Sequence, residues 1–583
     1  MLRNILEIKN LTTEFTSNNN SLKAVNNVSF SIDEGEIVGV VGESGSGKSV
    51  TSLSAMGLIP SPPGKITSGE ILFTKSDNTT VDTTKISYES LRKIRGNEVS
   101  MIFQEPMTSL NPVFSCGEQV AEAIILHQNV SSKEARNRTI HLFKKVKLPR
   151  PDQIFNQYPH QLSGGQKQRV MIAMAISCNP RLLIADEPTT ALDVTVQKTI
   201  LELLKELQGE TKMGILFITH DLGVIGELAD KVVVMYNGKV VEQGKSSDIF
   251  NNPQHPYTKG LISCRPPLNT RYYNLPTVTD FMEISETGEI RSKLKSIPEY
   301  LSKISIPIKS RKNAQQKLYT QKPLLVVKNL KTYFSLRRNL LGKTISWVKA
   351  VDDISFNVYP GETLGLIGES GCGKTTTGKS IIRLTPITSG KILYKGKNVL
   401  KMNKEDLFNF RKEVQIIFQD PYSSLNPRIS IGNSIKEPMC VHKRFSSDKE
   451  RKEEVLKILE KVGLKTEDYN KYPHQFSGGQ RQRICIARAL AMKPKFIICD
   501  ESVSALDVSV QAQVLNLLNE LKKDFGLTYI FISHDLSVIK YMCDRMVVMN
   551  KYGKIERYGD CDEIYEDPQT EYTRSLIDAI PKV

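Results

Sequence analysis

One octapeptide pattern occurs twice in this chain and constrains its fold more than any other feature. The pattern is Gly-x-x-x-x-Gly-Lys-Ser/Thr, and each copy follows a short apolar run and precedes a helix-forming stretch, as phosphate-binding loops do. The copies are Gly42-Glu43-Ser44-Gly45-Ser46-Gly47-Lys48-Ser49, after a predicted strand at 37–41, and Gly368-Glu369-Ser370-Gly371-Cys372-Gly373-Lys374-Thr375, after one at 364–367. Two chance glycine loops in this same context are not a credible alternative.

These residue types suit a polyphosphate. Glycines let successive backbone N–H groups turn inward around the phosphates, and the following helix N-terminus adds partial positive charge. We expect Lys48 and Lys374 to reach the β- and γ-phosphates, and the hydroxyls of Ser49 and Thr375 to ligate Mg²⁺.

Most of the remaining sequence is also present in two copies. Residues 6–11 correspond to 325–330, and 25–30 to 351–356. The offset is 326 at the loop lysines, 315 at Gln104/Gln419 and 314 at Ser163/Ser477, Asp186/Asp500 and His220/His534. The fall in the offset from 326 to 315 predicts about eleven extra residues between the loop and Gln104 in the first copy, and we assign them to a mobile loop at 74–85. We also predict a longer connection at 335–349 in the second copy. We predict two homologous domains, 1–267 and 323–583, joined by a linker at 268–322.

Strand-like and helix-like segments alternate in both copies, which predicts the α/β class with a mainly parallel sheet and helices on both of its faces. Apolar residues recur with helical spacing after each acidic motif, and we interpret them as core: Ile200, Leu203, Leu204 and Leu207, then Val514, Leu517, Leu518 and Leu521. Ligands of such a sheet bind at the carboxyl ends of its strands, where the two loops lie.

Composition excludes several classes of protein. Hydrophobic content is 39% and charged content 24%, and there is no apolar run of membrane-spanning length and no signal-peptide core, which predicts a cytosolic protein. The nine cysteines include no Cys-x-x-Cys pair, so neither a zinc site nor a disulfide framework is expected. Cys372, inside the second loop, is either an oxidation-sensitive thiol or a small residue tolerated in the loop.

The formal charge is +16, and half of this excess lies in one segment. Residues 290–322 contain nine Lys or Arg and a single acid, Glu299. The segment is either a solvated linker or a contact for lipid headgroups or RNA.

A pair of adjacent acids ends a second apolar run in each copy: Asp186-Glu187 and Asp500-Glu501. A carboxylate at a strand end beside the phosphate loop is how P-loop enzymes hold Mg²⁺, so Asp186 and Asp500 take that role. Glu187 and Glu501 are candidate general bases for the attacking water. The alternative is a helix cap.

A third repeated motif is Ser163-Gly164-Gly165-Gln166 and Ser477-Gly478-Gly479-Gln480, each before a helical stretch. A serine and bare N–H groups at a helix start form an anion site, although alone they could also be an ordinary cap. Together with the loops and acids, these motifs resemble those of the ATP-binding cassette (ABC) ATPases over nearly all of both halves.

The resemblance implies two nucleotide-binding domains, each with a mainly parallel core, an antiparallel β subdomain and a helical subdomain. It also implies head-to-tail pairing of the halves within the chain. One composite site then joins 42–49, Asp186 and Glu187 with 477–480; the other joins 368–375, Asp500 and Glu501 with 163–166.

Further roles follow from the resemblance, residue by residue. Gln104 and Gln419 match the glutamine that contacts Mg²⁺ and senses the membrane partner. Asp193 and Asp507 match the loop that crosses the dimer, and His220 and His534 the histidine at the γ-phosphate. Phe15 and Phe334 match the aromatic that stacks on adenine, although a core role remains open. Copy two has Ser502 where copy one has Pro188, which loosens φ after the base; the carboxylate remains, so two hydrolytic sites are predicted.

Two more repeats resemble the ATP-binding subunits of bacterial oligopeptide, dipeptide, nickel and glutathione importers, here fused. They are Glu105–Pro112 with Asp420–Pro427, and Asn252–Thr258 with Asp567–Thr573, where the second tail lacks the His-Pro of the first. The resemblance implies two integral-membrane permease subunits and an extracytoplasmic binding protein as partners, a peripheral location on the cytoplasmic face of the membrane, and no nucleic acid. Only Cys264 lies near the tail motif in copy one and no cysteine follows it in copy two, so no iron–sulfur cluster is expected. The alternative is a soluble two-cassette ATPase acting on the ribosome; the transported substrate is not encoded in this chain.

Overall fold

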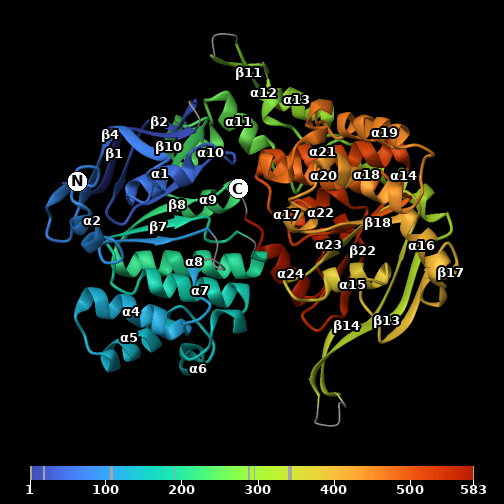
Figure 1. Cartoon of the computed structure of the whole chain (residues 1–583), viewed down its shortest axis with the longest axis horizontal. Helices are drawn as coiled ribbons and strands as arrows, with labels where there is room; N and C mark the ends of the chain where they lie inside the picture. Colours follow the sequence, from blue (N-terminus) through green and yellow to red (C-terminus); the bar gives the residue numbers. More distant parts are fainter. Residues whose placement is uncertain are drawn as a thin grey trace.

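The computed structural model describes residues 3–17, 20–104, 109–190, 192–285, 289–294, 296–338 and 344–581. Residues 105–108 of the importer repeat, Ala191, Lys295 and 339–343 of the longer connection lie outside them. Figure 1 shows two halves side by side, with the first half in blue to green and the second in yellow to red.

Each half begins with an antiparallel sheet, whose alternating apolar residues face inward. The first has the strand order β2-β1-β4-β5, and the second β14-β13-β16-β17. The strands are β1 (Asn4–Ser17), β2 (Asn20–Asp33), β4 (Gly64–Thr74) and β5 (Thr80–Asp82), then β13 (Leu325–Arg338), β14 (Thr344–Val358), β16 (Ser389–Tyr394) and β17 (Lys397–Asn398).

A six-stranded sheet forms the centre of each half, with orders β10-β9-β3-β8-β7-β6 and β22-β21-β15-β20-β19-β18. In each of these sheets only the strand that comes last along the chain, β10 or β22, is antiparallel to its neighbour. The strands are β3 (Ile37–Val41), β6 (Val99–Ile102), β7 (Leu182–Asp186), β8 (Gly214–Ile218), β9 (Lys231–Tyr236) and β10 (Lys239–Lys245), then β15 (Thr363–Ile367), β18 (Val414–Ile417), β19 (Phe496–Asp500), β20 (Thr528–Ile532), β21 (Arg545–Met549) and β22 (Ile555–Asp560). The predicted α/β class and the parallel core are confirmed.

Helices cover the sheets less evenly than the alternation predicts. In the first half, one sheet face packs on the helices α7 (Gly164–Ala175), α8 (Val194–Thr211) and α9 (Leu222–Leu228). The other face packs on α1 (Lys48–Ala55) together with the antiparallel sheet. Helices therefore lie on both faces, as predicted, and β1, β2 and β4 add much of the second apolar layer. The predicted core residues of α8, from Ile200 to Leu207, are buried, as are their equivalents from Val514 to Leu521.

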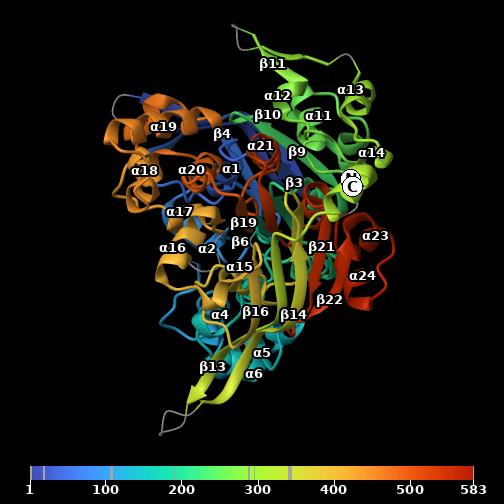
Figure 2. The same ribbon diagram turned by 90° about the vertical axis from the view of Figure 1, so that its right-hand side faces the viewer.

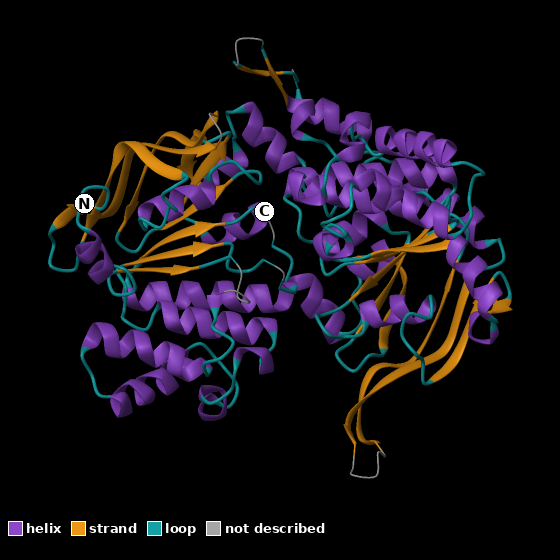
Figure 3. Cartoon of the chain, viewed as in Figure 1, coloured by secondary structure: helices purple, strands orange, loops and turns teal. Residues whose placement is uncertain are grey.

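The remaining helices include those of a helical subdomain and of a C-terminal tail in each half (Figure 3). In the first half these are α2 (Tyr88–Ile94), α4 (Cys116–Gln128), α5 (Ser132–Lys145), α6 (Pro151–Phe155), α10 (Ser246–Asn251) and α11 (Pro256–Ser263). In the second half the helices are α15 (Lys374–Ile381), α16 (Lys404–Glu413), α17 (Pro421–Ser424), α18 (Ile431–Val441), α19 (Asp448–Lys461), α20 (Gly478–Leu490), α21 (Val508–Phe525), α22 (Leu536–Met542), α23 (Cys561–Glu566) and α24 (Glu571–Asp578). Among the described residues, no helix combines the length and apolar character needed to cross a bilayer.

The extra residues of the first copy are not one mobile loop. Gly69 and Gly390 occupy the same place, since each lies against the backbone of its first strand at Leu11 or Leu330. Their offset of 321 places about half of the insertion before Gly69 and the rest after it. The later part is ordered, because Thr80–Asp82 forms β5, which pairs with β4.

The segment between the halves folds into short elements and returns to the second half. It contains α12 (Val278–Phe281), the hairpin β11 (Met282–Ile284) and β12 (Ile290–Ser292), α13 (Ile297–Ile304) and α14 (Ile308–Tyr319). Figure 2 shows α13 and α14 following β11 and α12 along one edge of the molecule. At the other end of the chain, α24 touches the first half, where Lys198 Nζ donates to the Asp578 carbonyl at 3.1 Å.

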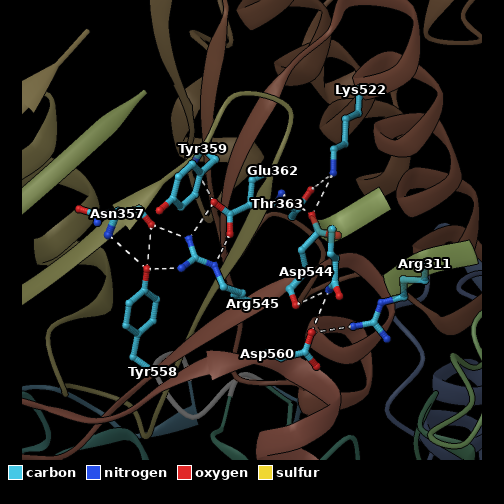
Figure 4. Close-up of polar contacts among 11 residues, drawn as sticks. Arg311, Asn357, Tyr359, Glu362, Thr363, Lys522, Asp544, Arg545, Tyr558 and Asp560 are labelled. Carbon is cyan, nitrogen blue, oxygen red and sulfur yellow. Dashed lines mark hydrogen bonds and ion pairs between the residues drawn. The ribbon is translucent and has the colours of Figure 1, made fainter. Parts of the chain in front are cut away.

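Helix α14 docks on the second half through polar side chains (Figure 4). Arg311, only 13% exposed, pairs with Asp560 at 3.4 Å and also with Asp562. Gln315 donates to the same Asp560 carboxylate at 2.9 Å. The ring of Tyr319 lies 4.8 Å from the guanidinium carbon of Arg545, which forms an ion pair with Glu362 at 2.7 Å. The linker's positive charge is therefore neutralised in part within the chain.

Replacing Arg311 with alanine should lower the apparent midpoint of thermal unfolding by roughly 5 °C. Removing one partner of this partly buried ion pair leaves the other with less compensation, at a cost of about 1.5–3 kcal/mol. Trypsin should also cut residues 290–322 faster once α14 is released. The exposed neighbour Lys312, changed to alanine, is the control and should behave as the native chain. Equal midpoints and cleavage rates for the two variants would contradict this docking.

Candidate active site

The two phosphate loops require glycine where the backbone passes close to neighbouring strands. A Cβ on Gly42 would lie 2.2 Å from the Met235 carbonyl oxygen, and one on Gly47, at φ +99°, would lie 2.5 Å from that of Ala24. The equivalent distances at Gly368 and Gly373 are 2.2 and 2.0 Å. No side chain fits there, so each loop is held between β9 or β21 and the antiparallel sheet.

Each loop lysine is buried and bonded to its own loop. Lys48 Nζ donates to the carbonyls of Gly42 at 2.7 Å and Glu43 at 2.8 Å. Lys374 repeats this with Gly368 at 2.7 Å and Glu369 at 2.9 Å. Burial lowers the pKa of Lys48, and the surrounding carboxylates, Glu187 foremost, oppose that shift. The ammonium thus stands in the cradle, where it can turn towards a phosphate.

The first acid of each pair lies beside the loop hydroxyl. Ser49 Oγ donates to Asp186 Oδ1 at 3.1 Å, and Thr375 Oγ1 donates to Asp500 Oδ1 at 2.8 Å. Asp186 ends β7 and Asp500 ends β19, so both acids lie at the carboxyl edge of the sheet. Burial raises the pKa of Asp186 to about 6 and raises that of Asp500. A bound cation would compensate the negative charge of these two buried carboxylates.

The second acid of each pair is the centre of a hydrogen-bonded group. Gln104 Nε2 donates to Glu187 Oε2 at 2.9 Å, and His220 Nδ1 lies 3.3 Å from the same oxygen. In the second half, Gln419 reaches Glu501 Oε2 at 2.8 Å, and His534 Nδ1 lies 3.4 Å from it. The structure therefore brings together the glutamine, glutamate and histidine predicted for each site.

The environment of these glutamates favours the charged form. Burial alone would raise the pKa of Glu187, but the hydrogen bond and charge of His220, with a hydrogen bond from Thr190, bring it to about 2. The pKa of Glu501 is also lowered: burial raises it, but the hydrogen bond and charge of His534 outweigh that. For His220, burial acts to lower the pKa and Glu187 outweighs it, so the net shift is upward. The pKa values of the two adjacent acids of the first site are thus shifted in opposite directions.

Both glutamates adopt the left-handed backbone conformation, with φ of +49° at Glu187 and +48° at Glu501. A non-glycine residue pays on the order of 1–2 kcal/mol for this conformation, which marks a constrained position. The values agree although Pro188 is replaced by Ser502, so the missing proline does not alter φ at the second base. The copies differ instead at Thr190, whose hydroxyl donates to Glu187 Oε2 at 2.9 Å. Its equivalent, Ser504, donates to the Glu501 carbonyl at 3.0 Å.

Each loop contacts the opposite half through an aspartate. Ser44 N–H donates to Asp507 Oδ2, and Ser370 N–H donates to Asp193 Oδ2, both at 3.3 Å. The other oxygen of each aspartate caps its own helix, accepting from Val196 or Val510 N–H at 2.9 Å. The first half adds Thr195 Oγ1, 3.2 Å from Glu369. The halves therefore face each other head to tail.

The Ser-Gly-Gly motifs cap their own helices. Ser163 Oγ accepts from Gln166 N–H, and Ser477 Oγ accepts from Gln480 N–H, both at 3.3 Å. Both serines are exposed. Gly479 lies against Val510, where a Cβ would be 2.2 Å from Cγ1, and Val510 is three residues after the crossing Asp507. This places 477–480 on the side of loop 42–49, which supports the expected pairing. The described contacts between a loop and the other half come from the aspartate segments.

The remaining sequence candidates are the two aromatic residues, Phe15 and Phe334, and Cys372. Phe15 packs on Gly64, where a Cβ would lie 2.9 Å from its ring, whereas Phe334 is 42% exposed on β13. Each aromatic lies on the strand next to the one that carries Ala24 or Ala350, whose carbonyl approaches the loop. Adenine stacking stays a prediction. Cys372 is 1% exposed, and burial raises the pKa of its thiol, which favours the role of a small loop residue.

Sequence reasoning missed several residues of the site. Thr190 and Thr195 were not singled out, and they belong to no motif larger than a hydroxyl near an acid. Two tyrosines of the C-terminal tails, Tyr257 and Tyr572, accept hydrogen bonds from the loops. Their matched sequence contexts, Pro-Tyr-Thr and Glu-Tyr-Thr, could have identified them. The absence of His-Pro from the second tail does not remove this contact.

The donor set suits Mg²⁺ bound mainly through phosphates and water. Each site offers one hydroxyl, one carboxylate and a glutamine, and the described residues contain no group of three or more His, Cys, Asp or Glu that could hold a metal. Mg²⁺ in such sites keeps several waters and takes one or two carboxylates plus substrate oxygens. The residues present therefore fit this ion.

The fold and the two sites define a paired P-loop nucleotide hydrolase. Residues 25–190 and 351–504 match the family model described as "ABC transporter", and residues 241–287 match "Oligopeptide/dipeptide transporter, C-terminal region". The chain is therefore a member of the ABC transporter family and carries two of its ATPase cassettes.

Relatives are similar over almost the whole chain. The glutathione import ATP-binding protein GsiA of Shigella boydii serotype 4 (strain Sb227) is 46% identical over 581 residues, which cover 99% of this chain and 90% of that protein. The GsiA proteins of Shigella dysenteriae serotype 1 (strain Sd197) and Escherichia coli (strain K12) are 47% and 46% identical over 579 residues, with the same coverage.

Proposed function

We propose that this chain is the ATP-hydrolysing subunit of an importer for glutathione or other small peptides, with two active composite sites. The observation that carries the proposal is the pair of matched sites, each completed by an aspartate of the opposite half, in a chain similar end to end to import ATP-binding proteins. We assign 1–267 and 323–583 as the two domains and 268–322 as the linker.

Within each site, the proposed roles follow the contacts. Lys48 and Lys374 bind the β- and γ-phosphates after leaving their loop carbonyls. Ser49 with Asp186 and Gln104, and Thr375 with Asp500 and Gln419, hold Mg²⁺, which supplies charge neutralisation on the phosphate oxygens. Segments 477–480 and 163–166 close over the nucleotide from the opposite half, and Phe15 and Phe334 contact adenine.

Hydrolysis is assigned to the two glutamates. All three neighbours of Glu187 reach Oε2, so Oε1 is the oxygen that accepts the proton of the attacking water. His220 and Gln104 hold the carboxylate in place, and His220 is near enough to turn towards a γ-phosphate. Glu501, Gln419 and His534 do the same in the second site.

The partners are two permease subunits, placing the chain on the cytoplasmic face of the membrane, with an extracytoplasmic binding protein delivering substrate. A groove beside Gln419 is lined by Ile416, Phe418, Pro438 and Val441 among polar residues. Val441 is 58% exposed, and its equivalent in the first half, Leu126, is 59% exposed. Apolar side chains exposed at the same place in both halves suit a cytoplasmic helix from each permease subunit. A ribosome-bound ATPase has no comparable support.

Purification of the tagged chain from membranes in mild detergent tests this assignment. We expect two hydrophobic subunits to copurify, and loss of the gene to abolish uptake of labelled glutathione or small peptides. Leu126→Glu with Val441→Glu should release the subunits, while Tyr552→Glu, a 65% exposed ring elsewhere, should not. Sedimentation with ribosomes and unchanged uptake would contradict the proposal.

A further inference from the structure

A tyrosine from the C-terminal tail of each half touches the phosphate loop of the same half. The hydroxyl of Tyr257 accepts a hydrogen bond from the Glu43 backbone N–H at 3.0 Å. The hydroxyl of Tyr572 accepts one from the Glu369 N–H at 3.2 Å. Both glutamates directly follow the first glycine of their loop, so the contact is the same in the two copies.

The tyrosines are fixed by the sheet beneath the loop. Tyr257 is fully buried, and its ring centroid lies 4.5 Å from that of Tyr236 at the end of β9. The Tyr572 hydroxyl also donates to the Met549 carbonyl on β21 at 3.1 Å. Strand β21 is the neighbour of β15, the strand that leads into the loop. The hydroxyl therefore ties the start of the loop to the adjacent strand.

The tail helices present these side chains although their first residues differ. Helix α11 is capped by His255, whose Nδ1 accepts from the Tyr257 N–H at 3.1 Å. Helix α24 is capped by Thr570, whose Oγ1 accepts from the Thr573 N–H at 3.2 Å. Different caps thus start the two helices at matched positions, and both helices keep the tyrosine.

The Gly42–Glu43 peptide is hydrogen-bonded both to the tyrosine and to the loop lysine. The carbonyls of Gly42 and Glu43 accept from Lys48 Nζ, and the Glu43 N–H donates to Tyr257. A buried N–H without an acceptor is costly, so losing the hydroxyl favours rotation of this peptide. Rotation would move the lysine and the N–H groups that follow in the loop, which are the groups that a phosphate binds.

We propose that Tyr257 and Tyr572 are positioning residues that hold the opening peptide of each phosphate loop and thereby set the affinity of each half for the nucleotide phosphates. The inference rests on the ATP sites proposed above. Because the loop binds phosphates before and during reaction, the loss should appear as weaker binding rather than slower turnover.

The test compares Tyr257→Phe, Tyr572→Phe and the double variant with the native full-length chain. We expect the KM for ATP of the double variant to rise about ten-fold, with kcat changed less than about two-fold. Inorganic tripolyphosphate, which has no adenine, serves as competitor, and its inhibition constant should rise in parallel. The matched control is Thr258→Val, because Thr258 is the buried neighbour of Tyr257 on α11 and its hydroxyl has no partner among the described residues.

The outcomes separate this inference from the proposed function. A native chain that neither hydrolyses ATP nor responds to tripolyphosphate would contradict the proposed function. A native chain that does both, with tyrosine variants equal to Thr258→Val, would overturn only the positioning role. A raised KM with an unchanged tripolyphosphate constant would also overturn it, as would a parallel fall in kcat and thermal midpoint.

Discussion

A chain carrying both Glu187→Gln and Glu501→Gln should hydrolyse ATP about 10²–10³-fold more slowly than the native chain while still binding two nucleotides. Glutamine keeps the size and the hydrogen-bonding position of the side chain but cannot take a proton from water. The lysines and loops are untouched, so equilibrium binding of labelled ATP should be unchanged. Steady-state phosphate release is the measurement of turnover.

The two single variants show how much of the ATP hydrolysis each site contributes. Both glutamates have the same φ and the same glutamine and histidine neighbours, so each single variant should retain measurable hydrolysis. Glu206→Gln, on the surface beside Lys147, is the control for loss of one carboxylate. If one single variant were as inactive as the double variant and the other as active as the native chain, only one site would be hydrolytic.

The two sites need not be equal, because their supporting hydroxyls differ. Thr190 binds the side chain of Glu187, whereas Ser504 binds the backbone of Glu501. The difference is local and lies outside the residues that define the motif. The sequence pointed to Pro188 and Ser502 as the departure between copies, but the preceding glutamates have nearly the same φ in both.

The parts of the fold that could be predicted are those encoded by local patterns. The strand before each loop and the amphipathic helices after each acid pair are legible from apolar spacing alone. The sheets were predictable as a class, but the packing of β1, β2 and β4 on one face was not, because alternation along the chain does not say which layer covers which. Helix α14 lacks a long apolar stripe and is held by Arg311, Gln315 and Tyr319 instead.

The parts of the site that could not be predicted from the residues alone are contacts between distant segments. Ser44 and Asp507 are 463 residues apart, and no periodicity connects them. Only the resemblance to a known family implied that the aspartate segments cross between halves. The tyrosine contacts are of the same kind, because Tyr257 is 214 residues from Glu43 and Tyr572 is 203 residues from Glu369.

The head-to-tail contacts also constrain how the sites communicate. Asp193 caps helix α8 with one oxygen and binds the opposite loop with the other, and Asp507 does the same on α21. A change in one loop therefore reaches the first turn of a helix in the other half through a single carboxylate. This arrangement favours coupled sites over independent ones.

Substitution of the loop lysines should separate binding from hydrolysis. Lys48→Ala should reduce the number of ATP molecules bound at saturating but micromolar nucleotide from two to one, and Lys374→Ala should do the same. The double variant should bind none under these conditions, an affinity loss of roughly 10²-fold or more at each site. The reason is that each ammonium is buried in the cradle, with 5% of either lysine exposed, and is held there by carbonyls of its own loop.

The lysine and glutamate variants are matched controls for each other, since both lie in the same site and only one class should remove nucleotide. Binding stoichiometry is measured by equilibrium dialysis with labelled ATP, and folding by thermal unfolding without nucleotide. Loss of Lys48 also leaves Glu187, Asp186 and Glu43 without their shared cation, so this variant is expected to be somewhat less stable. Two nucleotides bound tightly to the double lysine variant would show that the cradle is not the phosphate site, whatever the glutamate variants do.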